Sequence, residues 1–200
     1  MLCLSDEVNK DEVKQEKQEK KKGGKVKNFF VGLAAIFVLI LLISSLGDSD
    51  TETAPASYTK EQKQAFNSFY QEVLDKHAVA DAAFNEAGAT LTAVSESGMD
   101  RYTAYSIISD NKKLIDGTRL ILNEMKAPEW LSKDDKKTID DAMRNLTTGL
   151  FAKSEGIDKI LEFLDQPKPS LIEEAKTDFQ VGNSSMMDGV AKFLQLGLIE

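Results

Sequence analysis

Residues 66–94 read FNSFYQEVLDKHAVADAAFNEAGATLTAV, and the side chains suited to a protein core recur there at alternating spacings of four and three residues. This spacing is that of a heptad repeat, which places one stripe along a single face of an α-helix. A long helix with one such face has to bury it against other helices, so the pattern predicts a helical bundle. The stripe consists of Phe66, Tyr70, Val73, His77, Ala80, Phe84, Ala87, Leu91 and Val94.

Capping signals mark the first two helices. Thr59 followed by Gln62 resembles a capping box at the start of the first helix. Asp100 can cap a second helix that runs to about Lys126. Two apolar patterns overlap in this second helix, so the sequence leaves open which of its faces is buried. Its apolar residues are Ala104, Ile107, Ile108, Leu114, Ile115, Ile121, Leu122 and Met125.

Two more helices follow with the same heptad spacing. Ser132 can cap a third helix, which Pro167 ends, and Ser170 can cap a fourth. The third stripe is Ile139, Met143, Leu146, Leu150, Lys153, Ile157, Ile160 and Leu164, and the fourth is Ile172, Ala175, Phe179, Gly182, Met186, Gly189, Phe193 and Leu196. Because the loops are short, we predict an all-α fold: an up-down-up-down antiparallel four-helix bundle over residues 59–200.

An uncharged apolar stretch precedes the bundle. Residues 28–47 read NFFVGLAAIFVLILLISSLG, and the run from 29 to 46 would span roughly 27 Å as a helix, close to the thickness of a bilayer's hydrocarbon core. Lysines crowd its amino-terminal side and acidic residues its carboxyl-terminal side, which keeps the amino terminus inside. We predict a cytoplasmic Lys-rich tail over 1–27, a transmembrane signal-anchor helix over 28–46, a flexible linker over 47–58, and a bundle outside the cytoplasm.

A cleaved secretory signal is the alternative interpretation of this stretch. Ser45-Leu46-Gly47 places small residues where signal peptidase prefers them, and cleavage there would release the bundle from the cell. The apolar run is longer than the core of a usual signal, and a long tail of mixed charge precedes it, so we favour the anchor. A single-pass plasma-membrane protein of this design has the general style of bacterial envelope proteins.

Composition excludes several classes of function. Residues 28–200 carry a net charge of −10, which argues against nucleic acid as a partner. The single cysteine, Cys3, excludes an intrachain disulfide and a multi-cysteine zinc site. The single histidine, His77, excludes a two-histidine metal motif, and no nucleophile motif accompanies it. We therefore expect no enzyme, no bound metal and no cofactor.

Small residues mark the stripes of the first and fourth helices. Ala80 and Ala87 alternate with larger residues in the first helix, as Gly182 and Gly189 do in the fourth. In the predicted topology these two helices are neighbours, so we expect their backbones to approach closely along this seam. The alternative is that the missing side-chain volume leaves a ligand pocket between them.

Two polar positions in the stripes allow sharper hypotheses. Aligning the first and fourth helices end to end places His77 opposite Met186, a pair that can ligate haem iron, so a haem or copper site there is a remote option. Lys153 interrupts the third stripe, and we expect its ammonium to reach outward to solvent. The alternative is a buried polar layer in which Asp81 or Asp116 pairs with Lys153.

These expectations favour a binding protein. A single anchor, a long bundle and the absence of a catalytic motif predict a membrane-tethered, non-enzymatic module that binds a protein partner of unknown identity or the envelope. The alternative is an extracytoplasmic ligand-binding or sensor domain, with its pocket between the first and fourth bundle helices.

Overall fold

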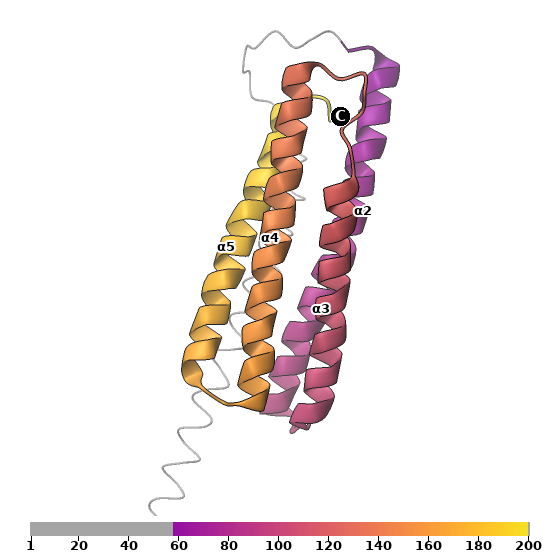
Figure 1. Ribbon diagram of the computed structural model, residues 1–200. Helices are drawn as coiled ribbons and strands as arrows, with labels where there is room; N and C mark the ends of the chain where they lie inside the picture. The colour runs from indigo at the N-terminus through magenta and orange to yellow at the C-terminus, as the bar shows by residue number, and fades with distance from the viewer. Residues whose placement is uncertain (1–57, 200) are drawn as a thin grey trace, which may run out of the picture.

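The computed structural model describes residues 58–199, which form four α-helices and no β-strand (Figure 1). The helices are α2 (Lys60–Glu96), α3 (Arg101–Glu124), α4 (Lys133–Asp165) and α5 (Pro169–Gln195). The all-α prediction is therefore confirmed for this part of the chain. The predicted tail and signal-anchor helix lie outside the described residues, as does the linker up to residue 57. None of the four helices described is long and apolar enough to cross a membrane.

Consecutive helices run in opposite directions (Figure 1). α2 packs against α3, α3 against α4, and α4 against α5, with the closest backbone contact between α4 and α5. The connection from α3 to α4 lies at the same end of the bundle as the start of α2 and the end of α5 (Figure 1). The other two turns lie at the opposite end.

The capping signals explain three of the four helix starts. Thr59 forms both hydrogen bonds of the predicted capping box, and the side chains of Asp100 and Ser132 accept the backbone N–H groups expected of helix caps. The predicted cap at Ser170 is wrong. α5 begins one residue earlier at Pro169, whose fixed φ suits the first helical position, and no side chain caps it.

The structure shows which face of α3 is buried in the core. The buried positions of this helix are Ala104, Ile108, Asn111, Ile115, Thr118 and Leu122. Choosing this face leaves Leu114 and Ile121 in solvent. The stripes of α2 and α4 are buried almost as predicted, apart from the last position of α2, Val94, which is partly buried. The ambiguity of α3 is therefore resolved by exposing large aliphatic side chains on its outer side.

Four glycines bring α4 and α5 together. A Cβ atom at Gly182 would lie 2.8 Å from the carbonyl oxygen of Gly149, and one at Gly189 would lie 2.9 Å from the carbonyl oxygen of Ala142. A Cβ at Gly156 would collide with the ring of Phe179. These distances are too short for any side chain, so the two backbones approach as closely as they do only because these positions are glycine.

The predicted close approach of α2 to α5 is wrong. The glycines of α5 meet α4, and the space between α2 and α5 is occupied by aromatic rings. Phe84 packs edge-on against Phe179 with ring centroids 4.8 Å apart, and Tyr70 lies 5.1 Å from Phe193. Large side chains between two helices hold their backbones apart, so α2 and α5 touch through rings and not through their small residues.

Tyr58 fixes the point where the chain enters the bundle. Its hydroxyl donates a hydrogen bond to Asp135 and accepts one from the backbone N–H of Ser132 at 2.9 Å. Its ring packs edge-on against Trp130, 5.4 Å between centroids. Trp130 is partly buried against the core, so it covers the end of the bundle from which the predicted linker departs.

The glycine contact can be tested with two alanine substitutions. Gly182→Ala should destabilise the domain by about 1–3 kcal/mol, because the added Cβ would overlap the backbone of α4. Gly117→Ala in α3 is the matched change, since an added Cβ there has no neighbour within 4 Å. It should stabilise the fold by roughly 0.5–1 kcal/mol through helix propensity alone. Urea denaturation of a fragment of residues 58–200, followed by circular dichroism, measures both, and equal effects would contradict the contact.

Candidate functional site

Lys153 lies at the centre of a polar layer inside the bundle. Its side chain is only 5% exposed, and its Nζ lies 3.2 Å from Oδ1 of Asp81 on α2. The same ammonium lies 4.7 Å from the centre of the Phe84 ring, within the range of a cation–π interaction. The expectation that Lys153 reaches outward is therefore wrong. The alternative, a buried layer with Asp81 as partner, is the arrangement that the structure has.

The glycine contact explains why this lysine is inside. A Cβ at Gly182 would lie 3.0 Å from Cγ of Lys153, so the aliphatic stem of the lysine occupies space that the glycine leaves open. A buried ammonium is costly unless it is paired, and Asp81 supplies the charge that makes this position tolerable. Lys153 and Gly182 are thus parts of one arrangement, in which α5 makes room for a side chain that links α4 to α2.

His77 joins the layer from the turn before Asp81. Its Nδ1 lies 2.9 Å from Oδ2 of Asp81, an ion pair when the imidazole is protonated. Burial raises the pKa of Asp81, but the contact with His77 and then the charge of Lys153 lower it by more. The pKa of the carboxyl group is therefore below its ordinary value, and Asp81 is the anion of the layer.

A second polar group adjoins the first between α3 and α4. Asp116 accepts hydrogen bonds from Ser154 Oγ at 2.8 Å and from Lys112 Nζ at 3.0 Å, and Lys112 also lies 3.3 Å from Asp158. Burial lowers the pKa of Lys112, but the two carboxylates raise it by more. Since Ser154 follows Lys153 in α4, the polar groups together connect α2, α3 and α4. Sliding one helix by a turn would leave a buried charge without its partner.

His77 and Met186 take separate packing positions. The ring contacts Phe84–Phe179 and Tyr70–Phe193 show that α2 and α5 are aligned as predicted. His77 and Met186 therefore lie at the same level along the bundle. Met186, however, packs against Gly149 of α4, while His77 faces Asp81. Within residues 58–199, no group of three or more His, Cys, Asp or Glu residues could hold a metal ion. The geometry therefore offers no feature that favours the haem or copper option.

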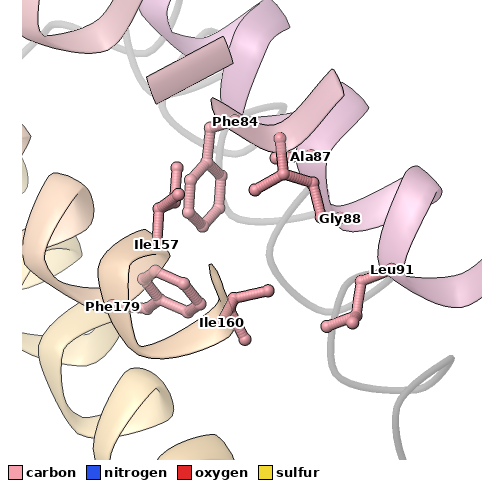
Figure 2. Close-up of a pocket in the computed structure, with 8 residues that line it drawn as sticks. Phe84, Ala87, Gly88, Leu91, Ile157, Ile160 and Phe179 are labelled. Carbon is pink, nitrogen blue, oxygen red and sulfur yellow. The ribbon is translucent and has the colours of Figure 1, made fainter. Parts of the chain in front are cut away.

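An apolar hollow lies beside Phe84 (Figure 2). Its volume is about 10 Å³, room for roughly one water-sized sphere. All four helices contribute to its wall, which consists of Phe84, Ala87, Gly88, Leu91, Ile108, Ile157, Ile160 and Phe179. Of the two small positions predicted in α2, Ala87 lines this hollow, and Ala80 is buried in the core. Aromatic side chains fill most of the space that the sensor hypothesis requires.

α3 presents apolar side chains to solvent along its outer side. Tyr102 is 85% exposed and Leu120 is 57% exposed. The exposed residues Tyr102, Tyr105, Leu114, Leu120 and Ile121 are together called the α3 outer face; with 3.6 residues per turn, Tyr105 lies on one flank of the exposed side, Leu114 and Ile121 lie on the other, and Tyr102 and Leu120 lie between them. Scattered exposed aliphatic residues are common on protein surfaces, but five large ones on a helix of 24 residues mark a surface suited to covering by a partner.

Sequence reasoning missed two parts of this arrangement. Gly149 and Gly156 of α4 are seven residues apart, the same spacing as Gly182 and Gly189 of α5. Comparing the two spacings would have paired α4 with α5. The α3 outer face was hidden in the overlap of two apolar patterns, because either pattern could have been the buried one.

Comparisons with known proteins place no relative beside this chain. No protein-family model, curated protein or solved structure matches it. The function of this chain has to be inferred from its own polar layer, its small apolar hollow and the α3 outer face.

Removing one charge of the buried pair should cost more than removing both. Asp81→Ala should destabilise the domain by about 3–5 kcal/mol, since it leaves the ammonium of Lys153 buried without a carboxylate. The double variant Asp81→Ala/Lys153→Met should recover a large part of that loss. Urea denaturation at neutral pH measures both, with Asp141→Ala as a surface control expected to cost less than about 0.5 kcal/mol. Additive losses in the double variant would argue against a coupled buried pair.

The same carboxylate predicts a loss of stability in acid. Because the pKa of Asp81 is lower in the fold than in the unfolded chain, where it is about 3.9, the unfolded state takes up the proton first as the pH falls. The stability advantage of the parent over Asp81→Asn should shrink as the pH falls from about 5 to about 3. Urea denaturation at a series of pH values measures this difference. An advantage that grows between about pH 5 and about pH 3 would contradict the direction of the pKa shift of Asp81.

Proposed function

We propose that this protein is a membrane-tethered, extracytoplasmic helical module that has no enzymatic activity and works by binding another protein. The uncharged stretch over residues 28–46 supports the tether, and the lysines before it with the acidic residues after it support the outward orientation. The alternative of a secreted bundle after signal cleavage leaves the binding role of the domain unchanged.

The observation that carries the proposal is the α3 outer face. The other apolar stripes of the described helices are buried against each other, whereas α3 leaves Leu114, Leu120 and Ile121 in water. Exposing side chains of this size gives no benefit to the isolated domain, and covering them would gain roughly 25 cal/mol per Å² of buried apolar surface. A partner that lies along α3 is the simplest way to obtain that gain.

The small volume of the apolar hollow makes the sensor alternative the weaker candidate. A pocket for a small molecule usually has several hundred Å³, whereas the hollow beside Phe84 has about 10 Å³. Binding there would require the rings of Phe84 and Phe179, which pack edge-on, to separate. The buried polar layer is one of the features that hold the adjoining helices in their present register.

The proposal can be tested by crosslinking the protein to its partner on the outer surface of intact cells. Cells that produce the tagged full chain are treated with a membrane-impermeant, amine-reactive crosslinker. Leu120→Asp should reduce the yield of crosslinked partner about tenfold, since a charge in the centre of a contact removes a large part of its affinity. Val181→Asp is the matched control, because Val181 is 50% exposed but belongs to α5.

Two results would contradict the proposal. Equal losses with Leu120→Asp and Val181→Asp would show that the α3 outer face has no special part in capture. Crosslinks that form only after the cells are broken would overturn the outward orientation.

A further inference from the structure

Arg119 is a partly buried cation at the seam between α3 and α4, which lie side by side (Figure 1). Its Cζ atom lies 5.5 Å from the centre of the Phe151 ring of α4, so the guanidinium packs over this ring as a cation–π pair. Within residues 58–199, Arg119 forms no ion pair with a carboxylate. Arg144 of α4, by contrast, lies 3.1 Å from Asp141. The guanidinium of Arg119 is therefore held in place by an aromatic ring alone.

The hydrogen-bonding groups of Arg119 are not satisfied within the described domain. Its Nε atom is shielded from solvent and has no hydrogen-bond partner, whereas Nη1 and Nη2 remain open to solvent. Asp116, the nearest carboxylate along α3, accepts hydrogen bonds from Ser154 and Lys112 instead. Taking a guanidinium partly out of water without a paired anion is unfavourable. A carboxylate from outside would offset this cost, because it can accept two parallel hydrogen bonds from the planar guanidinium.

Arg119 is the single charge in an otherwise uncharged stretch of the α3–α4 seam. It is the only charged residue over 117–123 of α3, and α4 has none over 145–152. These two stretches run beside each other, because Arg119 contacts Phe151. Charged residues make up 29% of the whole chain, so this part of the surface differs from the rest. A segment that binds here meets one positive charge and no second charge that it would have to neutralise.

Two exposed apolar side chains flank the guanidinium. Phe151 is 49% exposed, and Leu120, the residue after Arg119, is 57% exposed. Arginine and aromatic side chains in an apolar surrounding often contribute most of the binding energy of a protein interface. The ring also limits the motion of the guanidinium, so less conformational entropy is lost when a partner binds. This arrangement fits a segment in which a carboxylate stands beside an apolar side chain.

We propose that Arg119 is the central residue of the partner interface and binds a carboxylate of the protein partner, while Phe151 and Leu120 bind the apolar residue beside that carboxylate. This inference rests on the proposed function, to which it adds the chemistry of the partner and a contact on α4. Charge complementarity selects this occupant, because a basic or neutral segment would leave the guanidinium without an anion.

A peptide library tests which chemistry the site selects. The full chain is held in a lipid nanodisc and used to select from a phage-displayed library of random short peptides. Peptides that bind the parent more tightly than Arg119→Gln should contain aspartate or glutamate next to a large apolar residue. Replacing that acid by its amide should weaken binding to the parent about tenfold or more. The same replacement should have little effect on binding to Arg119→Gln, since both changes remove one shared contact.

Two further variants separate the geometry of the guanidinium from its charge. Arg119→Lys keeps the charge but loses the planar pair of donors, so its affinity for the selected peptides should lie between those of the parent and Arg119→Gln. Arg144→Gln is the matched control, because Arg144 already pairs with Asp141, and it should leave the affinity unchanged within about twofold. Fluorescence anisotropy of labelled peptides measures the dissociation constants, and circular dichroism checks that each variant is folded.

The outcomes separate this inference from the proposed function. If no selected peptide distinguishes the parent from Arg119→Gln, or if those that do lack a carboxylate, the inference is wrong. In the crosslinking experiment on intact cells, Arg119→Gln should lower partner capture about tenfold, as Leu120→Asp does. Capture that is lost with Leu120→Asp but unchanged with Arg119→Gln would reject the carboxylate contact and leave the proposed function standing. If neither variant changes capture, both proposals fail.

Self-association is the remaining alternative for the source of the carboxylate. Sedimentation equilibrium of the full chain in density-matched detergent should show the same oligomeric state for the parent and for Arg119→Gln. A parent that is dimeric beside a monomeric Arg119→Gln would make a second copy the occupant and overturn a separate protein partner.

Discussion

The contact between the glycines of α4 and α5 is the constraint on which the rest of the bundle depends. With Gly182 against the backbone of Gly149, α5 is drawn onto α4, and the side facing α2 has to be filled by the rings of Phe84 and Phe179. The same glycine leaves room for the stem of Lys153. A missing side chain in one helix thus determines where a charged side chain of the next helix lies, since protein interiors are packed without free volume.

The buried polar layer contributes specificity more clearly than stability. The attraction between Lys153 and Asp81 is offset by the cost of taking both charges out of water, so the pair adds little net stability. Its arrangement nevertheless disfavours other registers, because any shift of α4 against α2 separates the two charges. In a bundle whose helices all carry similar heptad stripes, several registers would bury comparable apolar surface, and the charges distinguish among them.

The orientation of α3 determines both which of its residues are buried and which of its apolar side chains are exposed. The stripe that α3 buries includes Asn111 and Thr118, whereas its larger aliphatic residues Leu114 and Ile121 stay in water. Turning α3 to bury Leu114 and Ile121 instead would move Asp116 away from Ser154 and Lys112 away from Asp158. The polar contacts between α3 and α4 and the exposed surface of α3 therefore have a common origin in the orientation of this one helix.

The sequence by itself determined the four helices, three of their caps and the buried stripes of α2 and α4, because these depend on the spacing of residues along one helix and on hydrogen bonds between near neighbours. Only the tertiary structure decided that Gly182 meets α4, that Lys153 turns inward to Asp81, and which face of α3 is buried. Each of these depends on which helix lies opposite and at what distance. A heptad pattern shows that a face is buried, but several partner helices satisfy it equally, and only packing in three dimensions chooses among them.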